Sequence, residues 1–259
     1  MSDVSGGWAI ETTNLTRKFG AQTAVDGIGF QVARGEVFGF LGPNGAGKTT
    51  TLRMLCGLLR PTAGEIRVAG ADVLREPVKA KARIGYLDEQ PFLYPHLTGR
   101  EFLDFVAALY SVAAADRDDR ADRLLAALDL ADRQHDLVAG YSQGMRQRIG
   151  LAALLIHEPE VLFLDEPTNG LDPRSARLVR NLIEELAVAG RTVVLSTHIL
   201  GIAQALCHRI AIMDGGHIVA IGTIADLQRQ AGVSDANLED LFLRLTAESG
   251  AESLWVAES

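Results

Sequence analysis

One segment of this 259-residue sequence combines closely spaced glycines with a lysine and a threonine. It fits the phosphate-binding pattern G-x-x-x-x-G-K-S/T, in which glycines let backbone N–H groups turn toward phosphate oxygens at a helix start. Lys48 can neutralise the β- and γ-phosphates, and the Thr49 hydroxyl can ligate Mg²⁺. A glycine-rich turn that only joins a strand to a helix is the alternative, but chance should produce all four fixed positions in well under about 1% of such chains. We therefore predict a nucleotide site formed by Gly42, Pro43, Asn44, Gly45, Ala46, Gly47, Lys48 and Thr49, with Thr50 extending the polar helix start.

A pair of acids follows a second apolar segment. Asp165 and Glu166 come directly after residues 161–164, so both carboxylates should emerge at the C-terminal end of a strand, where open α/β sheets bind ligands. Asp165 could orient Mg²⁺, and Glu166 could polarise the water that attacks the γ-phosphate. A solvated strand end is the alternative, but it does not explain the phosphate-binding loop. His198 also follows an apolar strand and could donate to the γ-phosphate, although a lone histidine there is often structural.

Strand and helix patterns alternate along the chain and should position these groups. The alternation predicts an α/β fold with a mostly parallel central sheet. Together with the phosphate-binding loop and the segments that follow, the expected fold is a P-loop NTPase with an N-terminal antiparallel β subdomain and a helical insertion. Strands are predicted at 37–41, 161–164 and 192–195, helices at 49–59 and 175–188, β-prone stretches within 8–40, the helical insertion within 98–140, a hairpin at 214–216 and a closing amphipathic helix at 238–245.

The composition restricts the class of function. The chain is 47% hydrophobic and carries a formal net charge of -8, which argues against an electrostatic grip on nucleic acid. No apolar run approaches the roughly 18 residues of a membrane-spanning helix, and the N-terminus lacks the features of a secretory signal. We therefore expect a cytoplasmic protein whose membrane role depends on another subunit. Cys56 and Cys207 lack C-x-x-C spacing, which favours two buried thiols over a metal or redox pair.

Several motifs in fixed order resemble those of the ATP-binding cassette family over nearly all the chain. They are the loop at 42–49, the segment 141–145, Asp165-Glu166, the turn at 169–172 and His198. The resemblance implies an ATPase that uses ATP and Mg²⁺. It also implies an ATPase domain at 8–230, with a helical subdomain inserted at about 95–150 and a short acidic helical extension at 231–259.

The segment 141–145 is similar to the family's signature sequence, which is L-S-G-G-Q in many members. Ser142 and Gly144 are retained, whereas Gln143 replaces the middle glycine. The resemblance implies that this segment contacts the γ-phosphate bound by an opposite cassette, so that a homodimer or heterodimer would enclose two ATP molecules. Independently of the family, Ser142 is a good N-cap for the helix that follows, and it could be only a cap.

Other residues also match family positions. The turn at 169–172, with Asp172, looks like the D-loop that links the two nucleotide sites, and Phe19 looks like the adenine-stacking aromatic, although core-facing phenylalanines are common. Family spacing would put the Q-loop glutamine at Glu89 rather than Gln90; either could approach Mg²⁺, so the ligand stays open. The segment 89–97 is expected to sense nucleotide and to meet the permease.

The resemblance implies a subunit that powers a membrane transporter. Residues 93–101 are similar to those of exporter ATPases with a separate permease chain, which would hold this protein on the inner face of the cell membrane. The alternative is a soluble cassette that remodels a protein or nucleic-acid complex, but the chain lacks long heptad arms and a broadly basic composition. A P-loop GTPase or nucleotide kinase fits less well, because the guanine-recognition pattern N-K-x-D is absent.

Overall fold

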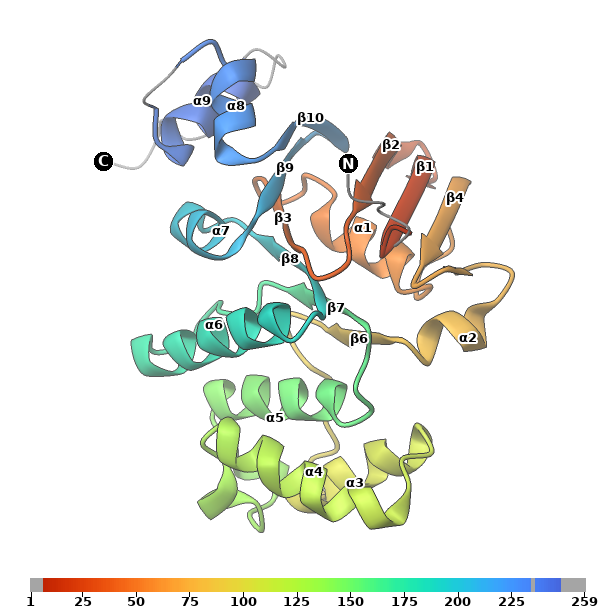
Figure 1. The fold of residues 1–259 in the computed structure, drawn as a ribbon, viewed down its shortest axis with the longest axis vertical. Coiled ribbons are helices and arrows are strands. Elements are labelled where there is room, and N and C mark those ends of the chain that lie inside the picture. Colours follow the sequence, from red (N-terminus) through yellow and green to blue (C-terminus); the bar gives the residue numbers. More distant parts are fainter. Residues whose placement is uncertain (1–6, 234–235, 248–259) are drawn as a thin grey trace, which may run out of the picture.

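The computed structural model describes residues 7–233 and 236–247, and within them two β-sheets lie side by side (Figure 1). The antiparallel sheet has the order β2-β1-β4-β5, and the larger sheet has the order β10-β9-β3-β8-β7-β6. In the larger sheet every pairing is parallel except that of β10 with β9. The strands are β1 (Ile10–Phe19), β2 (Gln22–Val32), β3 (Val37–Leu41), β4 (Ala63–Val68), β5 (Ala71–Asp72), β6 (Ile84–Leu87), β7 (Val161–Asp165), β8 (Thr192–Thr197), β9 (Arg209–Asp214) and β10 (His217–Gly222). The predicted α/β class and the antiparallel N-terminal part are confirmed.

The helices divide between the sheet and a separate layer. Helices α3, α4 and α5 gather at one end of the molecule, and α8 and α9 lie at the other (Figure 1). The helical insertion predicted within 98–140 is therefore confirmed. The helices are α1 (Lys48–Leu55), α2 (Pro77–Lys81), α3 (Gly99–Leu109), α4 (Ala114–Ala127), α5 (Gln143–Leu155), α6 (Pro173–Val188), α7 (Leu200–Leu206), α8 (Ile224–Gln230) and α9 (Leu238–Ala247), with short 3₁₀ turns η1 (Ala131–Arg133) and η2 (Val138–Gly140).

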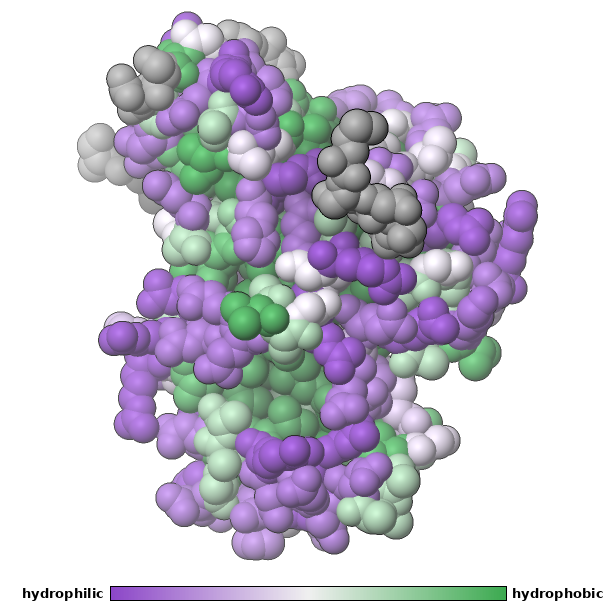
Figure 2. Space-filling view, in the orientation of Figure 1, coloured by the Kyte–Doolittle hydropathy of each residue, from purple (hydrophilic) through white to green (hydrophobic). Residues whose placement is uncertain are grey.

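The central strands are buried on both faces. Every residue of β3, β7 and β8 is buried, as the continuous apolar runs predicted. Phe38 and Phe40 of β3 pack with Phe30 of β2 on one face, the two β3 rings edge to face at 5.3 Å. Val37 faces the other core, which includes residues of α3 to α6. Figure 2 shows the apolar surface of this second core between the polar surfaces of α6 and α4.

Two expectations on length and burial need correction. The helix predicted at 49–59 ends at Leu55, because Gly57 has a φ of +65° and turns the chain out of the helix. Cys56 is buried as expected, but Cys207 is only partly buried in terms of surface area. Both are free thiols, and burial raises the pKa of Cys207 to about 12.

The C-terminal part follows the predicted order. The turn after Asp214 joins β9 to β10 as an antiparallel hairpin, and α9 matches the helix predicted at 238–245. Residues 234–235 and 248–259 of the predicted extension lie outside the described residues. Among the helices of the described part, none has both the length and the apolar character needed to cross a membrane.

Candidate functional site

A cavity of about 590 Å³ opens at the C-terminal edge of the parallel sheet. It brings together side chains from segments that lie far apart in the sequence. The predicted residues that line it are Phe19, Asn44, Gly45, Ala46, Gly47, Lys48, Thr49, Thr50, Glu89, Glu166 and His198. The structure therefore places the phosphate-binding loop, one acid of the pair and the histidine around a single space.

The loop between β3 and α1 can take its shape only because it carries glycines. Gly47 has a φ of +102°, and a Cβ there would lie 2.6 Å from the carbonyl oxygen of Ala24. A Cβ on Gly42 would lie 2.3 Å from the carbonyl oxygen of Met213. The loop is thus pressed between β2 and the end of β9, and any side chain at these two positions would open it.

Lys48 is a buried cation at the bottom of this loop, with 6% of its surface exposed. Its Nζ donates to the carbonyl oxygens of Gly42 at 2.7 Å and Pro43 at 3.1 Å, and lies 3.9 Å from Glu166 Oε1. Burial lowers the pKa of Lys48, and the negative charges of Glu166, Asp165 and Glu89 partly oppose that effect. An entering triphosphate would add further negative charge beside this ammonium group and stabilise it.

The two adjacent acids have different surroundings. Asp165 ends β7, where its Oδ1 accepts a hydrogen bond from Ser196 of β8, while its Oδ2 is buried without a hydrogen-bond partner. Glu166 adopts a φ of +46°, which is uncommon for a residue with a side chain. Its Oε1 lies 2.9 Å from His198 Nδ1, so the carboxylate accepts a hydrogen bond from the imidazole. The pair thus offers one buried acceptor and one histidine-linked carboxylate.

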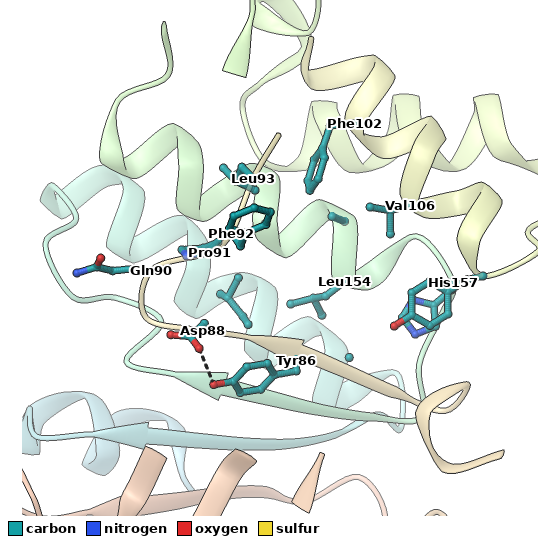
Figure 3. A pocket seen from close by; sticks show the side chains of 15 residues that line it. Tyr86, Asp88, Gln90, Pro91, Phe92, Leu93, Phe102, Val106, Leu154 and His157 are labelled. Carbon is teal, nitrogen blue, oxygen red and sulfur yellow. Dashed lines mark hydrogen bonds between the residues drawn. The ribbon is translucent and has the colours of Figure 1, made fainter. Parts of the chain in front are cut away.

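The structure places Glu89 and Gln90 beside two different cavities. Glu89 lines the cavity described above, and its Oε1 accepts a hydrogen bond of 2.8 Å from Asn169 Nδ2. Gln90 lines a second cavity of about 340 Å³ between β6 and the helical layer, together with Phe92 and Phe102 (Figure 3). Of the two, Glu89 is therefore the residue beside the phosphate-binding loop.

The signature segment lies outside this cavity, and of the D-loop only Asn169 lines it. The Ser142 hydroxyl accepts a hydrogen bond from the Met145 backbone N–H at 3.3 Å, which confirms the predicted N-cap of α5. Asp172 caps α6 in the same way, through the backbone N–H groups of Arg174 and Ser175. Neither these caps nor Gln143 and Gly144 line the cavity of their own chain. Their contact with a nucleotide on an opposite cassette stays a prediction.

Some lining residues were not expected from the sequence. The remaining ones are Gln22, Thr23, Ala24, Asn169, Gly215 and Gly216. The turn Asp214-Gly215-Gly216 had been predicted, but its position depends on tertiary contacts, since Gly216 accepts from the Asp26 backbone N–H and donates to Ala46.

The parallel sheet, the phosphate-binding loop and the acidic pair define a P-loop nucleoside triphosphatase. The family model "ABC transporter" matches residues 25–169. The chain is 45% identical to a daunorubicin resistance ATP-binding protein of Streptomyces coeruleorubidus, over 94% of this chain and 76% of the relative. This chain belongs to the ABC transporter family and is an ATP-binding, ATP-hydrolysing protein of it.

Two further comparisons are informative. A fluoroquinolones export ATP-binding protein of Mycobacterium tuberculosis is 45% identical over 85% of this chain and 72% of its own length. A solved ATP-binding cassette, dimeric in a post-hydrolysis state with ADP and phosphate bound, superposes with a TM-score of 0.77. That structure is 25% identical to this chain and covers 83% of it and 98% of itself. That cassette is thus a dimer with the products of ATP hydrolysis bound.

Proposed function

We propose that this chain is the ATPase subunit of an exporter whose membrane-spanning permease is a separate polypeptide. The observation that carries the proposal is the convergence of Lys48, Glu166 and His198 in one cavity of a transporter-family ATPase. The export function of the Mycobacterium tuberculosis relative supports the direction of transport. A test is affinity purification from the native membrane: an integral membrane protein should co-purify, whereas recovery with only non-membrane proteins would favour the remodelling alternative.

Each group around the cavity has a role that its contacts allow. Lys48 binds the β- and γ-phosphates as a fixed positive charge. Glu166 accepts a proton from the attacking water and lies 2.9 Å from His198 Nδ1. A His198 ring that carries protons on both nitrogens can hold this carboxylate and also donate to the γ-phosphate. The phosphate-binding loop contributes backbone N–H groups at the start of α1.

The donor groups fit a magnesium ion that accompanies the nucleotide. The buried Asp165 Oδ2 lacks a hydrogen-bond partner, and the Thr49 hydroxyl lies at the start of α1 beside the same loop. In the described part of the chain, no cluster of three or more His, Cys, Asp or Glu side chains could hold a metal alone. This agrees with a site that nucleotide oxygens complete, with Thr49 and Asp165 as protein ligands and Glu89 close by. When bound, Mg²⁺ would neutralise charge on the β- and γ-phosphates.

We further infer that two cassettes, identical or different, close around two nucleotides. The dimeric solved cassette supports this arrangement. The signature residues Ser142, Gln143 and Gly144, together with Asp172, would then meet the nucleotide of the opposite chain, since they lie away from their own cavity. Closing would be driven by ATP, which bridges the two surfaces.

We propose that the permease binds to the surface around the second cavity. Phe92 is 84% exposed beside it, and its ring contacts Tyr94, which in turn contacts Phe105 of α3. These aromatic side chains lie on or against the segment 89–97, next to the nucleotide-facing Glu89. An exposed aromatic group of this kind indicates a protein-protein contact.

Replacing Phe92 by aspartate tests this surface. We expect the co-purified membrane protein to fall at least about tenfold, because an anchoring aromatic is lost and a charge enters an apolar contact. Val188→Asp is the matched control, since Val188 is 91% exposed at the end of α6 and does not line the second cavity. Equal loss of the membrane protein in both variants would contradict the assignment.

Phe19 is expected to stack on the adenine. The guanidinium carbon of Arg17 lies 4.4 Å from the centroid of the Phe19 ring, and the ring lines the cavity. We expect Phe19→Ala to weaken binding of a fluorescent ATP analogue by about fivefold or more, since base stacking contributes about 1–3 kcal/mol. Phe19→Tyr should retain affinity. Inorganic tripolyphosphate should bind all three proteins alike, because it has no base; weaker tripolyphosphate binding to Phe19→Ala would refute the role.

A further inference from the structure

The glutamine that replaces a signature glycine has a specific contact within its own chain. Gln143, the first residue of α5, lies against Gly170 in the D-loop. A Cβ on Gly170 would lie 2.4 Å from Gln143 Nε2 and 3.0 Å from its Cδ. Gly170 also has a φ of +67°, which favours glycine. The Gln143 carboxamide therefore lies directly against the backbone of the D-loop at Gly170, at a position where both residues are exposed.

Further contacts connect α5 with the start of α6, which directly follows the D-loop. A Cβ on Gly144 would lie 3.6 Å from Ser175 Oγ, so the first turn of α5 packs closely along the start of α6. Asp129 Oδ2, between α4 and η1, accepts hydrogen bonds from Arg148 of α5 at 3.5 Å and Arg174 of α6 at 3.1 Å. The helical layer is thus connected to the D-loop side of the core through a packing contact and an ionic bridge.

The D-loop is held from the nucleotide side as well. Asn169, the residue before Gly170, lines the nucleotide cavity and donates to Glu89. Asn169 and Gly170 are adjacent, so the contact with Glu89 and the contact with Gln143 act on neighbouring residues of the D-loop. A shift at Glu89 would therefore reach the start of α5 through adjacent residues.

We propose that Gln143 is a positioning residue that fixes the D-loop to the signature helix, so that both elements of one chain move together when two cassettes close. The inference rests on the proposed pairing of cassettes. A glycine at position 143 would remove the contact and let the D-loop and α5 move separately. Closing of the two cassettes would then have to order the D-loop and α5 separately. The larger loss of conformational entropy would lower the population of the closed dimer.

The first experiment replaces Gln143 by glycine and, separately, by alanine, which removes the side chain without the backbone freedom of glycine. We expect kcat for ATP to fall at least about fivefold in both, while the affinity of single cassettes for a fluorescent ATP analogue changes less than about twofold. Gln143→Met should restore most of the rate, because it has a similar length and can pack on Gly170. Gln134→Ala, in the same inserted helical segment, is the control and should keep the wild-type kcat. Wild-type kcat in both Gln143→Gly and Gln143→Ala would overturn the proposal.

A double-mutant cycle with Gly170→Ala isolates the contact itself. Alanine at position 170 is strained in the left-handed backbone conformation whether or not Gln143 is present. The added methyl group, however, contacts a side chain at position 143 only in the protein that keeps Gln143. We therefore expect Gly170→Ala to reduce kcat at least about threefold more in the presence of Gln143 than in its absence. Equal reductions would refute a direct contact.

Hydrogen exchange of the nucleotide-free single chain gives a measurement that does not need pairing. The D-loop amides should exchange faster in Gln143→Gly than in the wild type, and unchanged exchange would overturn the proposal. If the wild-type protein does not dimerise in the presence of ATP, the proposed dimer is wrong. The hydrogen-exchange experiment would still decide whether Gln143 holds the D-loop.

Discussion

Replacing Glu166 by glutamine should stop ATP hydrolysis while ATP still binds. Glutamine has the same shape, so the hydrogen-bond geometry at His198 can persist, but it cannot accept the proton of the attacking water. Loss of a general base costs about 10²- to 10⁴-fold in rate, and we expect kcat to fall by at least about 100-fold. ATP affinity should be retained or increased, because a negative charge 3.9 Å from Lys48 Nζ is removed from the phosphate site. The measurement is steady-state phosphate release together with a binding titration.

Glu160→Gln is the matched control for this substitution. Glu160 precedes the same strand, β7, at its opposite end, where it pairs with Arg34 and Arg83 at the surface. This change removes one acid of the same type, yet it should leave kcat within about twofold of the wild type. If Glu166→Gln hydrolysed ATP as fast as Glu160→Gln, Glu166 would have no part in catalysis, and His198 would become the first residue to test as the base.

The glycine loop and the acidic pair could be predicted because their chemistry is local in sequence. The backbone N–H groups that can surround a phosphate belong to one short segment, 44–49, and the following helix starts at Lys48. Asp165 and Glu166 follow a run that is buried on both faces, which fixes the sheet edge on which they emerge. Neither inference required knowledge of what lies across the cavity.

Contacts between distant segments could not be predicted in this way. Glu89 and Gln90 are neighbours, yet they line different cavities, because the chain bends at these two residues after the end of β6. Family spacing favoured Glu89, but only the tertiary structure separates the two. The Gln143 contact with Gly170 is a similar case, because β7 lies between them in the sequence and only the fold brings them together.

The end of α1 shows the opposite situation, in which the sequence held the information. Leu58 and Leu59 continue the apolar spacing of the helix, and this periodicity favoured a helix to residue 59. Gly57 is a typical helix terminator and would have placed the end close to Leu55. Periodicity reports which face of a segment is buried, and it does not by itself report where the backbone changes direction.

Lys48→Ala should abolish both tight ATP binding and turnover. The ammonium group is the buried cation facing Glu166 and Asp165, and alanine would leave these acids without it beside the incoming phosphates. Removing one fixed donor to the developing charge costs about 10²- to 10³-fold in rate, so kcat should fall by at least about 100-fold. ATP affinity should weaken at least about tenfold, as expected for loss of a charge-assisted contact. Titration with a fluorescent ATP analogue and phosphate release measure the two effects.

The Lys48 and Glu166 substitutions should differ in one respect that separates binding from catalysis. Lys48→Ala should lower both the affinity for ATP and kcat, whereas Glu166→Gln should lower kcat alone. The reason is that, of these two side chains, Lys48 is the one that attracts the phosphates of bound ATP before the reaction. Lys79→Ala controls for loss of a lysine, since Lys79 pairs with Glu76 at the surface of α2 and should leave both quantities unchanged. Wild-type affinity in Lys48→Ala, with the fold intact by thermal unfolding, would mean that the glycine loop holds the nucleotide through its backbone and that Lys48 acts only on the transition state.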